Sequence, residues 1–132
     1  MMVLRQSSLE RLIEEYFKAW VTRDFPNIEY FFTHDVYYRE CNGASYRGLN
    51  ELNGWINSML KKQTVLEWDI SNIEKTDSGV FIVMWFFHAK EEKEYNFDGV
   101  SLIDFTDDKI SHISEYAASH DLYRPFKETG SN

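Results

Sequence analysis

Apolar and polar residues alternate along the second half of the chain, from Thr64 to about Ala118. A period of two is the pattern of a strand that buries one of its faces. Short polar turns interrupt it, among them Asp77-Ser78-Gly79 and Asp107-Asp108. We therefore predict four consecutive strands joined by hairpins, with the sequences VLEWDISNIEK, GVFIVMWFFHAK, EYNFDGVSLIDF and KISHISEYAA.

The first half of the chain has a helical period. Between Leu9 and Trp20, apolar side chains recur every three to four residues and form one face of a helix, with Ser8 as its expected N-terminal cap. Pro26 suits the first turn of a short helix through IEYFF, and LNELNGWINSMLKK carries a second long apolar face. Between these last two helices, DVYYREC is expected to be a strand and NGASYRG a loop.

Helices that precede a run of hairpin-linked strands, with no βαβ alternation, indicate an α+β fold. In such folds the helices cover one face of a mostly antiparallel sheet. We expect the 132 residues to form a single domain, with a core over about 8–123 and a frayed tail over 124–132.

Composition narrows the expected partners and setting. A net charge of −8 offers no basic patch for nucleic acid, and no apolar run reaches the roughly 20 residues of a membrane helix. Cys41 is the single cysteine, so neither an internal disulfide nor a cysteine-based zinc site is expected. We therefore expect a cytoplasmic protein that binds no nucleic acid, membrane, metal or cofactor. Aromatic residues make up 17% of the chain and must fill a core, a pocket wall or an interface.

Three segments resemble the nuclear transport factor 2-like superfamily, which includes SnoaL-like proteins and ketosteroid isomerases. They are IEEYFKAWVTRD, FFTHDVYYRECNGASYRG and YNFDGVSLIDFTDDKISHISEYAA. Two shorter stretches, FDGVSLIDF and EYAASHDLYRP, look most like an uncharacterised SnoaL-like group. The resemblance covers roughly Ser8 to Tyr123. It implies a strongly bent sheet wrapped around about three N-terminal helices, forming a cone with an internal cavity.

Three residues match the ketosteroid isomerase pattern. Tyr16 matches the first-helix Tyr that donates a hydrogen bond to a developing oxyanion, and Glu40 falls where the isomerases keep their carboxylate base. Ser101 falls near their second oxyanion donor, which is a protonated carboxylic acid. Because a serine replaces that acid, the resemblance does not favour steroid isomerisation.

Glu115 matches a second pattern. SnoaL-like cyclases and limonene-type epoxide hydrolases keep an Asp at this point of the last strand, as an acid or a base. Glu115 is in step with Ile113 and Ala117, on the predicted inward face. The epoxide hydrolases also use an Arg and an Asp two residues apart on an earlier strand. The corresponding stretch FIVMWFFHA has neither, so epoxide hydrolysis is disfavoured.

A carboxylate in an aromatic pocket loses water, which raises its pKa and makes it a useful base near neutral pH. If Phe105 pairs with Ser111, then Ser101 lies opposite Glu115 at about 5 Å. Glu115 is then either a working cavity residue or a structural carboxylate satisfied by Ser101. Glu40 has the alternative of an exposed strand end.

The function implied is the binding of a small, apolar or aromatic molecule. One alternative is cofactor-free acid–base chemistry of the isomerase, dehydratase or cyclase type, with Glu115 or Glu40 as base and Tyr16 and Ser101 as donors. The other is a non-catalytic module that binds a small molecule or dimerises. The remaining residues expected to line the cavity are large and apolar: Trp20, Tyr38, Trp55, Trp68, Trp85, Phe87, Phe97, Ile103 and Ile113.

The late strands also carry apolar residues on their other face, among them Val100 and Leu102. A sheet covered on one side should be mainly polar on the other. A second buried surface is therefore expected, and we predict a homodimer through this face of the sheet.

Overall fold

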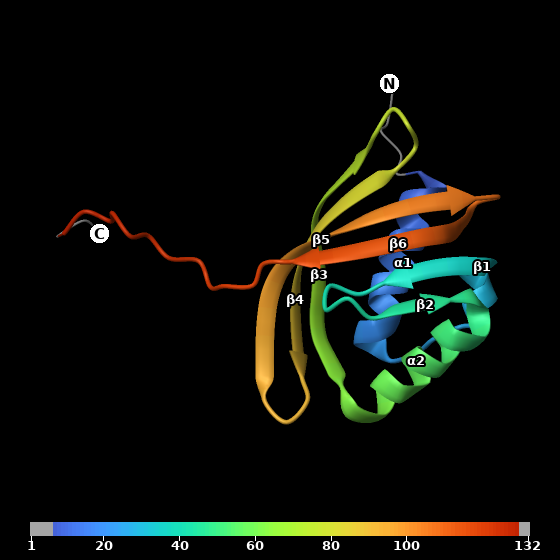
Figure 1. Cartoon of the computed structure of the whole chain (residues 1–132), viewed down its shortest axis with the longest axis horizontal. Helices are drawn as coiled ribbons and strands as arrows, with labels where there is room; N and C mark the ends of the chain where they lie inside the picture. The colour runs from blue at the N-terminus through green and yellow to red at the C-terminus, as the bar shows by residue number, and fades with distance from the viewer. Residues whose placement is uncertain (1–6, 130–132) are drawn as a thin grey trace, which may run out of the picture.

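The structure is a computed structural model that describes residues 7–129. Its centre is a curled six-stranded sheet in the order β2-β1-β6-β5-β4-β3 (Figure 1). β1 and β6 run parallel, and every other neighbouring pair is antiparallel. This is the predicted α+β architecture. The strands are β1 (Phe32–Arg39), β2 (Ser45–Arg47), β3 (Thr64–Lys75), β4 (Phe81–Lys90), β5 (Glu94–Thr106) and β6 (Lys109–Ala117).

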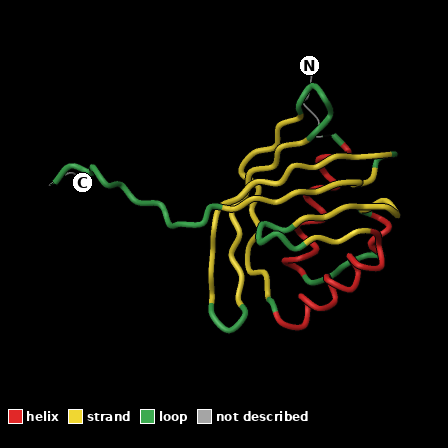
Figure 2. Tube along the Cα trace, in the orientation of Figure 1, coloured by secondary structure: helices red, strands yellow, loops and turns green. Residues whose placement is uncertain are grey.

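The helices lie together on one side of the curled sheet (Figure 2). They are α1 (Ser8–Thr22), the 3₁₀-helix η1 (Ile28–Tyr30) and α2 (Gly48–Lys62). The apolar face predicted for the first helix is confirmed, because its large side chains are buried against the sheet. Ser7, and not Ser8, caps α1: its hydroxyl accepts a 3.1 Å hydrogen bond from the Glu10 amide. None of the helices described in residues 7–129 is long and apolar enough to cross a membrane.

Two short elements differ from the prediction. The helix expected after Pro26 is only the three residues of η1, capped by Asn27, and the next strand begins at Phe32. The expected loop NGASYRG contains β2, which pairs with β1 through Tyr46 and Tyr38. Strand β2 is too short to show a period of two, so its pairing depends on β1.

The closing hairpin has the predicted register at its centre, with Ser101 opposite Glu115. Near the turn the prediction is wrong, because Phe105 pairs with Ile110 and not with Ser111. Both turn residues, Asp107 and Asp108, have positive φ angles of 51° and 63°. Two left-handed residues make a tight two-residue turn. An irregularity between Asp104 and Phe105 then shifts the register by one and restores the predicted pairs beyond it.

The outer face of the sheet and the segment after β6 expose apolar side chains. On the sheet, Met84 and Tyr116 are 49% and 43% exposed. The chain beyond β6 leads away from the body of the molecule (Figures 1 and 2). Its three large apolar side chains, Leu122, Tyr123 and Phe126, are 90%, 79% and 94% exposed.

Candidate functional site

A cavity of about 70 Å³ lies between the helices and the inward face of the sheet. Its walls come from α1, α2 and five of the strands, so the curl of the sheet creates it. All four tryptophans of the chain contribute to it. The lining residues are Trp20, Tyr38, Glu40, Cys41, Trp55, Met59, Gln63, Val65, Trp68, Trp85, Phe87, Phe97 and Glu115.

Ring contacts hold the tryptophans in place. Trp68 stacks on Phe17 of α1 with ring centroids 3.8 Å apart, and Trp55 stacks on Tyr46 at 4.9 Å. Trp85 lies over Gly99, its partner on β5: a Cβ added there would lie 2.2 Å from the indole. A glycine at position 99 is therefore required for this position of the ring.

Glu115 ends a buried chain of hydrogen bonds. The Tyr16 hydroxyl of α1 donates to the Tyr38 hydroxyl of β1 at 2.7 Å, and the Tyr38 hydroxyl donates to Glu115 Oε2 at 2.7 Å. Burial, together with the Coulombic effect of Glu40, raises the pKa of Glu115 from 4.5 to about 8, and the Tyr38 hydrogen bond opposes this rise. The Glu115 side chain is therefore mostly a neutral acid at pH 7.

Oε1 of Glu115 has no hydrogen-bond partner within residues 7–129, whereas Oε2 accepts from Tyr38. Oε1 is therefore the carboxyl oxygen that is available to a molecule in the cavity. The carboxyl group lines the cavity. This arrangement suits the exchange of one proton with a molecule in the cavity.

Glu40 follows β1 and lies on the same cavity wall. Its Oε2 accepts a 2.7 Å hydrogen bond from the Tyr46 hydroxyl. Partial burial raises the pKa of Glu40, while Tyr46 and the charge of Lys62 lower it. The cavity thus has two carboxyl groups, and the pKa of each is raised mainly by the loss of water.

Ser101 has a different partner from the one expected. Its hydroxyl accepts a 2.9 Å hydrogen bond from the indole Nε1–H of Trp85. Within the described part of the chain, no hydrogen bond joins the side chains of Ser101 and Glu115, although the two residues are paired in the sheet. Ser101 therefore fixes the Trp85 ring.

The structure brings most of the expected residues together around one cavity. Glu40, Glu115 and seven of the nine expected lining residues, all aromatic, contribute to its wall. Ile103 and Ile113 lie outside this lining, fully buried in the core. Tyr16 and Ser101 are also fully buried, and each contacts a lining residue from behind.

Four lining residues were not foreseen. Met59 lies one helical turn after Trp55 on α2, so this spacing could have predicted that the two side chains share a face. Cys41 and Gln63 lie just beyond the ends of β1 and α2, where a sequence pattern does not tell which way a side chain points. Val65 lies within β3, and a register irregularity between Val65 and Glu67 puts it on the same face as Trp68.

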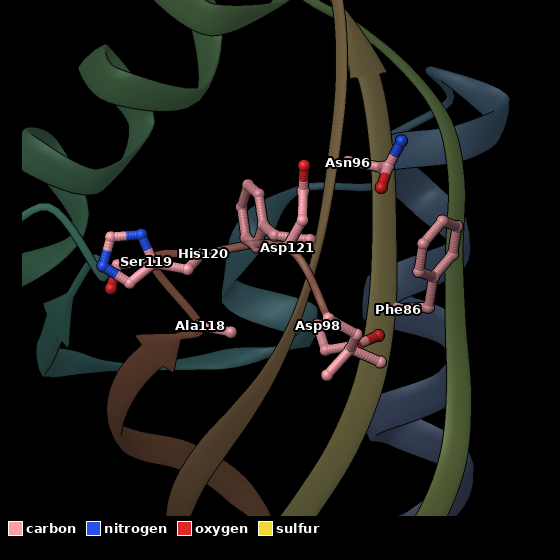
Figure 3. Close-up of a pocket in the computed structure, with 9 residues that line it drawn as sticks. Phe86, Asn96, Asp98, Ala118, Ser119, His120 and Asp121 are labelled. Carbon is pink, nitrogen blue, oxygen red and sulfur yellow. The ribbon is translucent and has the colours of Figure 1, made fainter. Parts of the chain in front are cut away.

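A wider groove of about 560 Å³ lies on the outer side of the sheet (Figure 3). It is formed where the segment after β6 passes Phe86 and the β5 residues Asn96 to Asp98. None of the hydrogen-bonded tyrosines or glutamates described above lines it. We therefore take the smaller, aromatic cavity as the candidate site. Within residues 7–129 there is no cluster of three or more His, Cys, Asp or Glu side chains placed to hold a metal ion.

The sequence matches the profile of the SnoaL-like domain over residues 13–113. The chain therefore belongs to the SnoaL-like family of the nuclear transport factor 2-like superfamily. No curated protein matches it significantly.

Many solved structures share the fold. A candidate polyketide cyclase from Xanthomonas campestris pv. campestris is 18% identical, with a TM-score of 0.69 over 82% of this chain and 88% of that one. An LEH-like epoxide hydrolase from M. tuberculosis is 15% identical, with a TM-score of 0.73 over 83% and 78%. A protein of unknown function from Burkholderia pseudomallei K96243 is 13% identical, with a TM-score of 0.72 over 86% and 92%. At these low identities, the structural similarity establishes the shared fold alone.

Proposed function

We propose that the chain binds a small, largely apolar organic molecule in the aromatic cavity and exchanges a proton with it through Glu115. The observation that carries the proposal is the chain of hydroxyls from Tyr16 through Tyr38 to Glu115. These hydrogen-bonded hydroxyls orient Oε2 of Glu115 and leave Oε1 free to act on a molecule in the cavity. With its raised pKa, Glu115 suits proton transfer near neutral pH. The similar fold of the candidate polyketide cyclase is compatible with cyclase or isomerase chemistry.

The cavity sets limits on the substrate. A volume of about 70 Å³ accommodates a group of a few heavy atoms, so a larger molecule would place only one end there. A carboxylate of raised pKa can remove a proton from a carbon next to a carbonyl group, so we expect the bound end of the molecule to carry such a group. Glu40, hydrogen-bonded by Tyr46, is the second acid of the wall.

Deuterium exchange tests the proposal. Cyclopentanone and 2-cyclohexenone are incubated in D₂O with wild-type protein, with Glu115→Gln and with Glu92→Gln, which makes the same substitution at an exposed position. NMR measures deuteration next to the carbonyl, and tryptophan fluorescence measures binding. We expect exchange above the buffer rate for the wild type and Glu92→Gln, and loss of the acceleration for Glu115→Gln. Binding without exchange would favour the non-catalytic alternative. Neither binding nor exchange would contradict the proposal.

A second candidate function, a dimeric interaction module, rests on the segment after β6. Leu122, Tyr123 and Phe126 extend into solvent. Large apolar side chains that cluster on a surface commonly mark an interface. The outer face of the sheet is also partly apolar, through residues such as Met84 and Tyr116. We propose that a second copy covers both surfaces, with each C-terminal segment packing on its partner's sheet.

Charge supports a second copy as the partner. The segment contains Arg124 and Lys127, whereas β3 presents Glu67 and Asp69 on the outer face. Partial desolvation and the neighbouring Glu67 raise the pKa of Asp69. Basic residues of a neighbouring segment would relieve the repulsion within this acidic pair.

Sedimentation velocity tests the dimer. We expect a species of twice the 15.7 kDa chain mass for the wild type, and a monomer for the double variant Leu122→Glu, Phe126→Glu. The control Glu128→Gln should remain dimeric. A wild-type mass of 15.7 kDa at every concentration would contradict the dimer and leave the proposal for the cavity untouched.

A further inference from the structure

The cavity contains two carboxyl groups without a cationic partner. Within residues 7–129, neither Glu40 nor Glu115 forms an ion pair. The three ion pairs found there join His34 to Glu29, and His88 to Glu67 and Glu94. Lys62 acts on Glu40 from a distance beyond 4 Å. Buried carboxylates in proteins are normally paired, because an isolated buried charge is costly. A positive charge in the cavity would therefore stabilise the ionised form of both groups.

The remaining wall is mainly aromatic. The rings stand at steep angles to one another: Trp68 meets Trp85 at 87° with centroids 5.7 Å apart, and Phe87 at 86° and 5.5 Å. Several rings of different orientation around one space form the cage that attracts alkylated ammonium groups, because each ring face is negatively polarised. No lysine, arginine or histidine lines the cavity. The indole N–H groups of Trp20, Trp55 and Trp68 are buried without a hydrogen-bond partner within residues 7–129, so they are uncharged donors of this wall.

The size of the cavity fits such a group. About 70 Å³ is room for roughly five water-sized groups. A trimethylammonium head has four heavy atoms and an apolar surface, and it needs no hydrogen-bond acceptor. The methyl groups would contact the rings, and the charge would lie between the carboxyl groups of Glu40 and Glu115.

We propose that this cavity binds the alkylated, positively charged nitrogen of a small organic cation. The inference rests on the function proposed above and narrows its ligand class. Such a cation favours the ionised carboxylate, so binding near neutral pH drives the proton of Glu115 into solvent. A neutral molecule of the same shape would leave that proton in place. The ligand itself would then convert Glu115 from an acid to a base.

Other groups near Glu115 affect this ionisation. Tyr38 stabilises the carboxylate through its hydrogen bond, and the charge of Glu40 opposes it. Tyr16, Tyr46 and Cys41 each have a pKa raised by burial and by the charge of Glu115, so they are neutral near pH 7. Glu115, with its pKa of about 8, is therefore the group of this cluster whose charge changes near neutral pH, and Glu40 is the other carboxyl group whose pKa is raised by burial.

The test compares choline with 3,3-dimethyl-1-butanol, its neutral analogue of the same shape. Quenching of the four tryptophans, all in the cavity wall, reports binding. We expect choline to bind at least tenfold more tightly than the alcohol at pH 9, with a smaller ratio at pH 6. Near neutral pH, calorimetry in two buffers of different ionisation enthalpy should show that choline binding releases a proton and that binding of the alcohol does not. Equal affinities at pH 9 would overturn the inference.

The same data separate this inference from the proposed function. If the alcohol binds as tightly as choline, the cation claim fails and the cavity remains a small-molecule site. If neither binds, both proposals fail. Glu115→Gln and Glu40→Gln should each lower the choline-to-alcohol ratio, whereas Glu92→Gln, in an exposed turn, should preserve it. An unchanged ratio in both cavity variants would also overturn the inference.

Discussion

The hydroxyl of Tyr38 is both a hydrogen-bond donor and an acceptor between two distant parts of the chain. It donates to Glu115 Oε2 and accepts from Tyr16, each across 2.7 Å. Tyr38 and Glu115 lie on β1 and β6, the one parallel pair of strands in the described sheet. The parallel pairing of β1 with β6 thus also brings Tyr38 to Glu115 and orients its carboxyl group.

The stability of the protein should fall as the pH rises through the neutral range. Glu115 has a pKa of about 8 when folded and an ordinary value of 4.5, so between these values the folded state holds a proton that the unfolded state has lost. Its contribution is complete below pH 4.5 and is lost as the pH rises to about 8, at up to about 1.4 kcal/mol per pH unit. Urea unfolding at pH 5 to 9 measures this slope. Glu115→Gln should flatten it and Glu92→Gln should not, and equal slopes in all three proteins would contradict the assignment.

Tyr38→Phe should be more costly than Tyr16→Phe. The first removes a donor from Glu115 and the acceptor of Tyr16, leaving two buried groups without partners, at about 1–3 kcal/mol each. The second removes only the donor to Tyr38. Because the Tyr38 hydrogen bond lowers the pKa of Glu115, Tyr38→Phe should also raise that pKa further. Urea unfolding and NMR titration check both effects, and equal costs would argue against a linear chain of hydrogen bonds.

Gly99→Ala should destabilise the fold by roughly 1–3 kcal/mol, as other overpacked sites do. The new methyl would lie 2.2 Å from the Trp85 ring, which must move. Gly54→Ala is the matched control. Position 54 lies in α2 with no atom within 4 Å of an added Cβ, and alanine there should stabilise by about 0.5–1 kcal/mol. Thermal unfolding with tryptophan fluorescence measures both changes, and a neutral Gly99→Ala would contradict the packing described.

Ser101→Ala separates two roles for this serine. The variant leaves the Trp85 indole N–H without its acceptor, which costs about 1–3 kcal/mol and changes the tryptophan emission. The pKa of Glu115 should stay near 8, because no hydrogen bond joins the two side chains in the structure. A clear rise of that pKa in Ser101→Ala would instead show that the serine supports the carboxylate.

Periodicity predicted the elements that bury one continuous face. The first helix and the four late strands each repeat an apolar pattern over nine residues or more, so their faces could be assigned without the structure. Strand β2 could not be predicted this way. Its three residues, Ser45 to Arg47, become a strand only by pairing with β1.

The contacts of the site were harder to predict than its location. The predicted register correctly placed Ser101 opposite Glu115, yet the serine hydroxyl accepts its hydrogen bond from the Trp85 indole. The indole can reach it because Gly99, two residues before Ser101, has no side chain to exclude the ring. The link from Tyr16 to Tyr38 spans 22 residues and depends on how a helix packs on a sheet. The spacing of apolar residues within one element cannot predict such a contact.

The central claim is that burial in the cavity wall keeps Glu115 protonated at neutral pH. A carbon-detected NMR titration of the glutamate side-chain carboxyl groups tests it, with the Glu115 signal assigned by its absence in Glu115→Gln. We predict that one carboxyl resonance titrates near pH 8 and that it is the one missing from the variant. A Glu115 resonance that titrates near 4.5, as an ordinary glutamate does, would contradict the account.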